Sequence, residues 1–287
     1  PSVAPGKEAD YASSLGYGLG YLGGGVLFAL NVWMYLNPST FFLRDQVQAV
    51  QISFLTVAVW WGLFSIPLFK NVPEPLASHP DISFLQATYD SVLKLKQTLK
   101  AMMKEKNTFI FLLAYWLYID GVFTVMTMAV DFGISMGLPV ASLISALLIV
   151  QFIGFPFALI FSLFSKKWGC RVPILISVAV YGVTVIGATY MSAPRHFVYL
   201  AIVIGIVQGG VQALSRSLFS RMVPAGESGE YFGLFNLIGK FASVLGPILV
   251  GWGASLSGDP RKGLLGLLVL FIVGGILLWN VREPAID

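Results

Sequence analysis

Charged residues are scarce in this sequence. Only 11% of its 287 residues are Asp, Glu, Lys or Arg, whereas 56% are hydrophobic, and the mean hydropathy is +0.80. Soluble domains usually carry about 25% charged residues, and a buried core does not need so many apolar side chains, so lipid must solvate much of the surface. The composition excludes a water-soluble fold and predicts an integral membrane protein.

Cysteine and histidine are scarcer still. The single Cys170 cannot form an internal disulfide, and neither His79 nor His196 stands with it at a metal-ligand spacing. We therefore expect no metal site and no cofactor. The net charge is +4, and the basic residues fall at the edges of apolar segments rather than in one stripe. Their expected partners are lipid head groups, not nucleic acid.

An initiator methionine is also lacking. The chain starts at Pro1, and its first residues are polar, unlike the charged and then apolar start of a signal peptide. We interpret the start as a truncation and expect further helices upstream.

Long apolar runs dominate what is present. A helix that crosses the bilayer needs about 20 apolar residues, and segments bounded by charges, Pro or Gly meet this length eight times. They predict an all-α polytopic membrane protein with the spans Leu15–Leu36, Ala49–Phe69, Asn107–Val130, Pro139–Phe164, Val172–Met191, Phe197–Leu214, Tyr231–Leu256 and Gly263–Val281.

The distribution of cations predicts the orientation. An even number of spans places both termini on one side, and loops on the cytoplasmic side carry an excess of Lys and Arg. The other side holds only Arg44, Arg195, Arg261 and Lys262. We therefore expect both termini in the cytoplasm, with these cations on their side: Lys7, Lys70, Lys94, Lys96, Lys100, Lys104, Lys106, Lys166, Lys167, Arg171, Arg216, Arg221 and Arg282.

One long connection divides the spans into two and six. Prolines 73, 75 and 80 indicate an extended start, whereas Ser83–Lys106 places apolar residues on one helical face opposite lysines. This pattern predicts a basic amphipathic helix on the inner leaflet. The expected parts are residues 1–70 as the last two helices of an amino-terminal bundle, 71–106 as a cytoplasmic linker, and 107–287 as a carboxyl-terminal six-helix bundle, the division of a transporter built from two six-helix halves.

Four segments carry a family resemblance. The chain is similar to the vacuole effluxer family of the major facilitator superfamily, which includes autophagy-related protein 22 and bacterial relatives. The resemblance implies alternating-access transport, with eukaryotic relatives associated with amino acid export from the vacuole. The matching segments are Ser13–Gly24, Tyr115–Gly121, Gln208–Ser217 and Glu230–Ser243, which resemble the fifth, seventh, tenth and eleventh helices of the family.

A basic turn repeats another feature of the superfamily. The segment from Ser165 to Arg171 resembles the turn that connects corresponding helices of each half, but the acidic residue that usually precedes the basic pair Lys166 and Lys167 is absent. The sequence therefore does not predict a charge relay at this turn.

Two charges lie deep in predicted spans. A charge at the bilayer centre costs about 2.5–3.5 kcal/mol on insertion scales, so it usually faces a bundle interior or a cavity. Asp120 and Lys240 could face one another there. The pair could hold their two helices together in one state, and could release a proton or bind a zwitterion in another. A static salt bridge is the simpler alternative.

Polar residues at helical spacing accompany these charges. Asn236 shares a face with Lys240, and Gln208 with Gln212 and Ser215. We expect Gln212 and Asn236 to line a cavity. Interhelical hydrogen bonding is the alternative, and it is the preferred interpretation for two further residues, Gln151 and Asn31.

Two tyrosines, and four charged residues near the ends of predicted spans, are the remaining candidate site residues. Tyr115 and Tyr118 could offer a hydroxyl group or a ring face to a ligand, although aromatic residues more often serve packing. Arg216 and Arg221, with Glu230 and its neighbour Glu227, could form an inner gate of ion pairs, and membrane anchoring is the alternative.

A glycine stripe could bring helices together. Gly16, Gly20 and Gly24 recur every fourth residue in the first span, and small residues allow close helix approach. We expect packing there, or a sliding contact during transport.

Other functions lack their signatures. A membrane enzyme needs converging catalytic groups, and a channel needs a pore loop or a ring of charges; neither is visible in the sequence. We expect a secondary transporter of a small polar solute, with an amino acid favoured by the resemblance, coupled to protons or another ion, in a bacterial inner (plasma) membrane. The alternative is a truncated or non-transporting membrane subunit.

Overall fold

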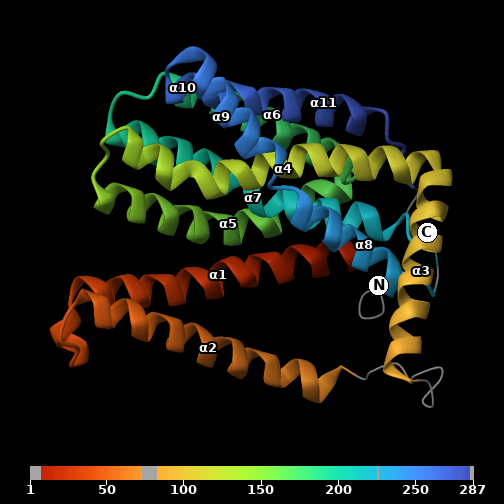
Figure 1. The fold of residues 1–287 in the computed structure, drawn as a ribbon, viewed down its shortest axis with the longest axis horizontal. Coiled ribbons are helices and arrows are strands. Elements are labelled where there is room, and N and C mark those ends of the chain that lie inside the picture. The colour runs from red at the N-terminus through yellow and green to blue at the C-terminus, as the bar shows by residue number, and fades with distance from the viewer. Residues whose placement is uncertain (1–7, 73–82, 225, 285–287) are drawn as a thin grey trace. The chain divides into compact units, whose positions relative to one another are not determined.

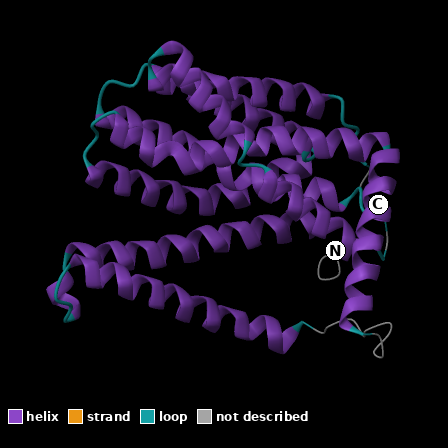
Figure 2. Cartoon of the chain, in the orientation of Figure 1, coloured by secondary structure: helices purple, strands orange, loops and turns teal. Residues whose placement is uncertain are grey.

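The computed structural model describes residues 8–72, 83–224 and 226–284. Within these ranges every regular element is helical (Figure 2), and eight segments are long and apolar enough to cross a membrane. The predicted all-α polytopic fold is confirmed. In chain order (Figure 1) the elements are α1 (Ala9–Leu36), η2 (Pro38–Phe41), α2 (Gln46–Asn71), α3 (Phe84–Lys104), α4 (Lys106–Ser135), α5 (Val140–Trp168), α6 (Arg171–Thr189), α7 (Pro194–Ser220), α8 (Ser228–Phe241), α9 (Leu245–Ser257), α10 (Pro260–Gly263), η3 (Leu264–Gly266) and α11 (Leu267–Trp279).

The last two predicted spans are not single helices. Residues Ser228–Ser257 form α8 and α9, with a turn between them, and Pro260–Trp279 comprises α10, η3 and α11. Pro247 lies in the first turn of α9, where a missing backbone N–H is tolerated because that turn has no intrahelical acceptor for it. Apolar periodicity continues through such a break, so the hydropathy pattern did not predict it.

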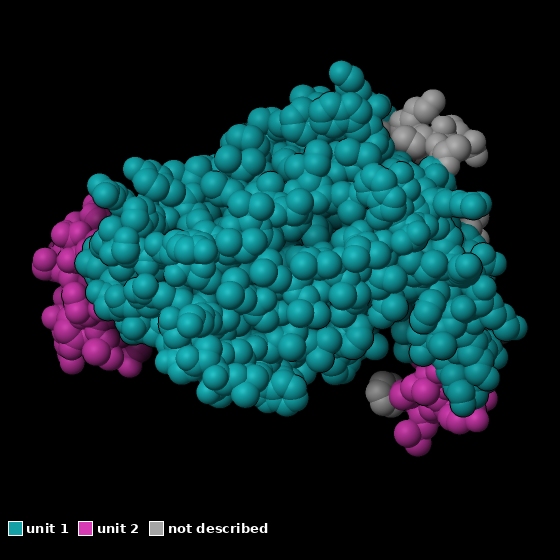
Figure 3. Space-filling view, turned by 90° about the horizontal axis from the view of Figure 1, so that it is seen from above, with its two compact units in different colours: residues 1–22, 93–287 teal, residues 23–92 magenta. Residues whose placement is uncertain are grey.

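The helices form two compact units (Figure 3): unit 1, residues 1–22 with 93–287, and unit 2, residues 23–92. In unit 2, Thr56 of α2 donates a hydrogen bond to the Asn31 side chain of α1 at 2.9 Å, the interhelical role expected for Asn31. The Asp45 carboxylate caps α2 by accepting from the Gln48 N–H at 2.8 Å. Most of α2 exposes apolar side chains, as a lipid-facing helix does.

A helix lies where the sequence predicts the basic amphipathic helix. α3 occupies Phe84–Lys104, and Lys106 begins α4. The prolines at 73, 75 and 80 lie outside the described residues. From Leu93 onward α3 belongs to unit 1, where Met102 is buried.

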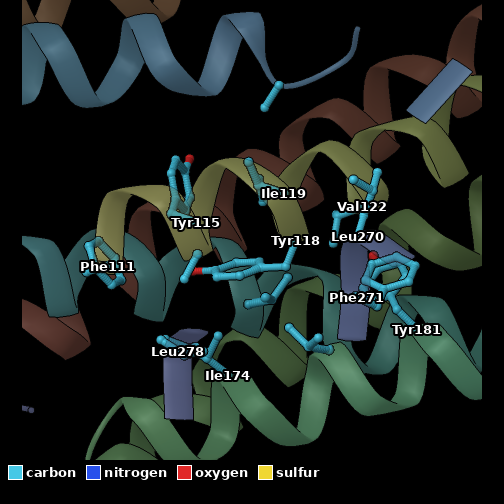
Figure 4. Packing of buried hydrophobic residues seen from close by; sticks show 14 of the residues in the cluster. Phe111, Tyr115, Tyr118, Ile119, Val122, Ile174, Tyr181, Leu270, Phe271 and Leu278 are labelled. Carbon is cyan, nitrogen blue, oxygen red and sulfur yellow. The ribbon is translucent and has the colours of Figure 1, made fainter. Parts of the chain in front are cut away.

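The core of unit 1 is built along one face of α4 (Figure 4). Phe111, Tyr115, Tyr118 and Val122 recur every three or four residues, so they share a side of the helix. They pack with residues of α6 and α11, including Tyr181 and Phe271, whose rings stack at 5.7 Å between centroids.

Glycines bring pairs of helices into backbone contact. A Cβ atom at Gly209 of α7 would lie 2.9 Å from Ala158 Cβ of α5, and one at Gly274 of α11 would lie 2.9 Å from the Tyr118 backbone nitrogen of α4. Close helix approach through small residues is typical of membrane bundles. These contacts hold α5 against α7 and α11 against α4.

Candidate functional site

A cavity of about 780 Å³ lies inside unit 1. Its volume falls within the range of about 300–1,000 Å³ that small-molecule sites usually occupy. Most of its lining comes from α1 and α7, with contributions from Met126 of α4, Gln151 of α5 and Phe232 of α8. The cavity is therefore an open one, lined by helices that are distant in sequence.

Two polar rows, one on α1 and one on α7, line the cavity. Ser13, Tyr17 and Tyr21 are four residues apart on α1, and α7 presents Gln212 and Arg216 at the same spacing. Residues four apart share a helix face, so each helix offers one polar row. The Ser13 hydroxyl donates to the Ala213 carbonyl at 2.8 Å and joins the two helices at the cavity edge.

The glycine stripe of α1 has a different role from the one expected. Gly16 and Gly20 line the cavity, and a Cβ atom at either position would meet nothing within 4 Å. The close contact is made instead by Gly18, where a Cβ atom would lie 3.2 Å from the Phe155 carbonyl of α5. Among the described residues no helix packs against Gly16 or Gly20, because the face that carries them borders the cavity.

Arg216 brings a positive charge to the cavity wall. Its guanidinium lies 5.3 Å from the centre of the Phe232 ring and interacts electrostatically with the Tyr17 phenol. The ion pairs formed among the described residues belong to Arg221 and leave Arg216 without a carboxylate. The Phe232 ring and the Tyr17 phenol hold the cation at the cavity, where no described carboxylate pairs with it.

Amides and phenols supply the deeper polar groups. Gln208 donates to the Tyr21 hydroxyl at 3.1 Å, which leaves the Tyr21 proton to be donated elsewhere. Gln212 approaches the Met126 sulfur at 3.8 Å. Gln151 lines the same cavity instead of serving as the interhelical bridge that the sequence favoured.

Asp120 is fully buried and binds the start of α9. Its carboxylate accepts from the backbone N–H groups of Leu245 at 3.0 Å and Gly246 at 2.7 Å, and more weakly from Val244 at 3.3 Å. The first N–H groups of a helix lack intrahelical acceptors and carry the positive end of its dipole. Asp120 therefore supplies the cap of a helix that starts inside the bundle, as discontinuous transporter helices do.

A cluster of charges closes one end of unit 1. Arg221, which follows α7, donates through Nη2 to both oxygens of Asp10, at 2.7 and 2.6 Å, and through Nη1 to Glu283. Asp10 also accepts from Ser217 and from Ser165 at 2.7 Å. We call Asp10, Arg221 and Glu283 the latch. Burial acts to lower the Arg221 pKa, but the surrounding negative charges outweigh it and raise the pKa.

The basic turn is bound to the latch. The N–H groups of Cys170 and Arg171 donate to Glu283 at 2.8 and 3.0 Å, and Gly169 makes the turn with a φ of +72°. Burial, together with the charge of Asp10, raises the pKa of the Cys170 thiol. The turn itself contains no acidic residue. Its acidic partners are Asp10 of α1 and Glu283 of the segment after α11.

Comparison with known proteins matches residues 5–284 to the family described as vacuole effluxer Atg22 like. The chain belongs to this family. The Bacillus subtilis (strain 168) protein named "Uncharacterized MFS-type transporter YxiO" is 34% identical over 284 residues, covering 98% of this chain and 65% of that protein. Autophagy-related protein 22 of Yarrowia lipolytica is 27% identical over 291 residues, covering 91% of this chain and 48% of that protein. The chain thus spans about half to two-thirds of the length of these Atg22-like relatives.

In this Atg22-like chain the expected contact between Asp120 and Lys240 is not formed. Asp120 is occupied by the α9 backbone, whereas Lys240 and Asn236 are exposed on α8. The break at Ala242–Val244 ends α8 just after Lys240, so a continuous helix could not be extrapolated past it. Asn236 does not line the cavity, but Gln212 does.

The two tyrosines of α4 serve the core. Tyr118 donates to Ser215 at 2.7 Å, because the Ser215 hydroxyl donates in turn to the Val211 carbonyl. Tyr115 stacks on Phe235 at 4.3 Å between centroids. Neither residue lines the cavity.

The gate candidates separate. Arg221 joins the latch, Arg216 faces the cavity, and Glu230 lies in the first turn of α8 without an ion pair among the described residues. Sequence reasoning missed Asp10 and Glu283 as partners of Arg221, and Tyr17 and Tyr21 as lining. The four-residue spacing of Ser13, Tyr17 and Tyr21 is a signal that could have found the lining.

Proposed function

We propose that this chain belongs to a secondary active transporter that moves a small polar solute, with an amino acid as the leading class, by alternating access. The observation that carries the proposal is the cavity, which is lined by polar rows of α1 and α7 inside an all-helical membrane bundle. Family membership supports it, because the bacterial relative is named an MFS-type transporter.

The proposed architecture follows the division of the sequence. Residues 1–70 supply two helices of an amino-terminal bundle, 71–106 a cytoplasmic linker and 107–287 the carboxyl-terminal bundle. Both termini face the cytoplasm of a bacterial cell, and the protein resides in the inner (plasma) membrane. The charge tally supports this orientation. It places the latch on the cytoplasmic side.

The latch is our proposed inner gate. Ser217 lines the cavity and donates to Asp10, so the ion pair of Asp10 and Arg221 borders the cavity where α1 begins and α7 ends. Separating these residues would move α1 from α7 and open that end. The gate thus retains Arg221 from the sequence prediction and replaces Glu230 with Asp10 and Glu283.

The proposed coupling ion is a proton, carried by Asp120. Protonation would remove the negative charge that holds the first N–H groups of α9, and a helix start without its anionic cap is less stable. Proton binding would thereby loosen the turn between α8 and α9. The opposite charge of Lys240 takes no part in this step.

Reconstitution tests the function. The protein as made by its native host would be placed in liposomes with an imposed pH gradient, and uptake of a radiolabelled amino acid panel measured. We expect uptake that collapses with a protonophore and is lost in Asp120→Asn. Asp131→Asn, an exposed change on the same helix, is the control. Gradient-independent uptake, or full activity in Asp120→Asn, would refute the coupling, and the absence of uptake across the panel would refute the amino acid assignment.

A further inference from the structure

We infer that the cavity binds its solute through a carboxylate group held by Arg216, and that it selects neutral or acidic solutes over basic ones. This inference deepens the proposed function and rests on it for the direction of movement, though the binding itself can be measured without transport.

The first argument for a carboxylate ligand is the positive charge in the cavity lining. Arg216 is the charged residue among the described side chains that line it. The guanidinium lies close to the Phe232 ring. The planar guanidinium of an arginine can donate two parallel hydrogen bonds to the two oxygens of a carboxylate. Because no described carboxylate pairs with Arg216, its charge can balance that of an anionic ligand.

The neighbouring acid does not cancel this charge. Asp10 adjoins the cavity end, but both of its oxygens accept from Arg221, with further bonds from Ser165 and Ser217. The latch is therefore a self-contained ion cluster. A basic solute would meet Arg216 without a described carboxylate free to pair with it.

The remaining lining suits the rest of such a solute. Gln212, Gln151 and the Tyr21 hydroxyl offer uncharged donors and acceptors, and Met126 and Phe232 offer apolar surface. Arg216 stands one helical turn from Gln212, about 6 Å along α7, so one small solute can contact both. Phosphate groups are usually held by several cations or by backbone N–H groups together, and a single guanidinium favours a carboxylate.

A binding assay on the whole protein in detergent tests the inference. The shift of its unfolding temperature would be recorded with leucine, glutamate, lysine and leucinol, and with inorganic phosphate as a second anion. We expect leucine or glutamate to stabilise the protein, and lysine, leucinol and phosphate to do so much less. Loss of one charged hydrogen-bonding partner should raise Kd by about tenfold or more in Arg216→Gln, with partial recovery in Arg216→Lys.

Arg195→Gln is the matched control, since Arg195 is an exposed cation at the opposite end of the same helix; its Kd should equal that of the unchanged protein. Equal binding of leucinol or phosphate, an unchanged Kd in Arg216→Gln, or no binding by either carboxylate probe would overturn the inference. Arg216-dependent carboxylate binding in a protein that shows no uptake would refute the transport function and leave the inference standing.

Discussion

The Gly246 N–H donates to the Asp120 carboxylate at 2.7 Å across two helices, at a point where α9 begins inside the bundle. A Cβ atom at Gly246 would lie 2.8 Å from the same carboxylate oxygen. The contact therefore requires both the acid on α4 and the missing side chain on α9.

Gly246→Ala should weaken this cap. The added methyl group must displace the carboxylate or the Thr124 side chain, and overpacking of this kind costs about 1–3 kcal/mol. Thermal unfolding in detergent should show a lower Tm. Gly251→Ala, on the same helix with nothing within 4 Å of its Cβ position, should leave Tm unchanged. Equal effects of the two changes would show that the cap contributes nothing.

A side chain at Gly274 should destabilise the protein, whereas a side chain at the neighbouring Gly275 should be tolerated. A Cβ atom at Gly274 would meet backbone atoms of α4 at 2.9 and 3.2 Å, while one at Gly275 would meet Val178 at 3.7 Å. Backbone cannot rotate away, so Gly274→Ala should lower the free energy of unfolding by about 1–3 kcal/mol. Gly275→Ala should be nearly neutral, and a similar loss in both variants would argue against close contact of α11 with α4.

Cys170 should react slowly with maleimide in the folded protein. The thiol is buried and its pKa is raised, so little thiolate is present at pH 7. A free thiol with a pKa of about 8.5 nears its maximum rate by pH 9, but the folded protein should show a rate still rising at that pH. The raised pKa also means that stability falls as pH increases past the pKa of the unfolded thiol. Fast labelling at pH 7, equal to that of the denatured protein, would contradict this.

Breaking the latch should expose the same thiol. Arg221→Gln leaves Asp10 and Glu283 without their cation, and removing one partner of a buried pair costs about 3–5 kcal/mol. We expect faster labelling of Cys170, with Arg195→Gln unchanged. The double variant Asp10→Asn with Arg221→Gln should be more stable than Arg221→Gln alone, because no buried Asp10 charge is then left unpaired. A double variant no more stable than the single one would argue against the ion pair.

Filling the cavity should block solute binding without unfolding the protein. Gly20 lines the cavity and has free space around its Cβ position, so Gly20→Leu should reduce uptake strongly at an unchanged Tm. Gly62→Leu on α2, a position equally open and outside the cavity lining, is the control. Normal uptake by Gly20→Leu would remove α1 from the proposed transport path.

The sequence by itself determined the class of this protein. Hydropathy over windows of about 20 residues is a local property, and it located all eight spans because lipid solvation depends on composition rather than on partners. The amphipathic pattern of α3 and the polar spacing of α7 could also be predicted from the sequence, because residues three or four apart lie on the same face of a helix.

Only the tertiary structure decided which faces meet. Asp10 and Arg221 are separated by 211 positions, and Asp120 and Gly246 by 126, so nothing in the local pattern pairs them. The interruption between α8 and α9 keeps the apolar character of a span, and the carboxylate that stabilises it comes from another helix. Packing also separated Gly18, pressed against α5, from Gly16 and Gly20, which border the cavity. Helical periodicity describes one helix at a time, whereas a cavity is a property of several helices together.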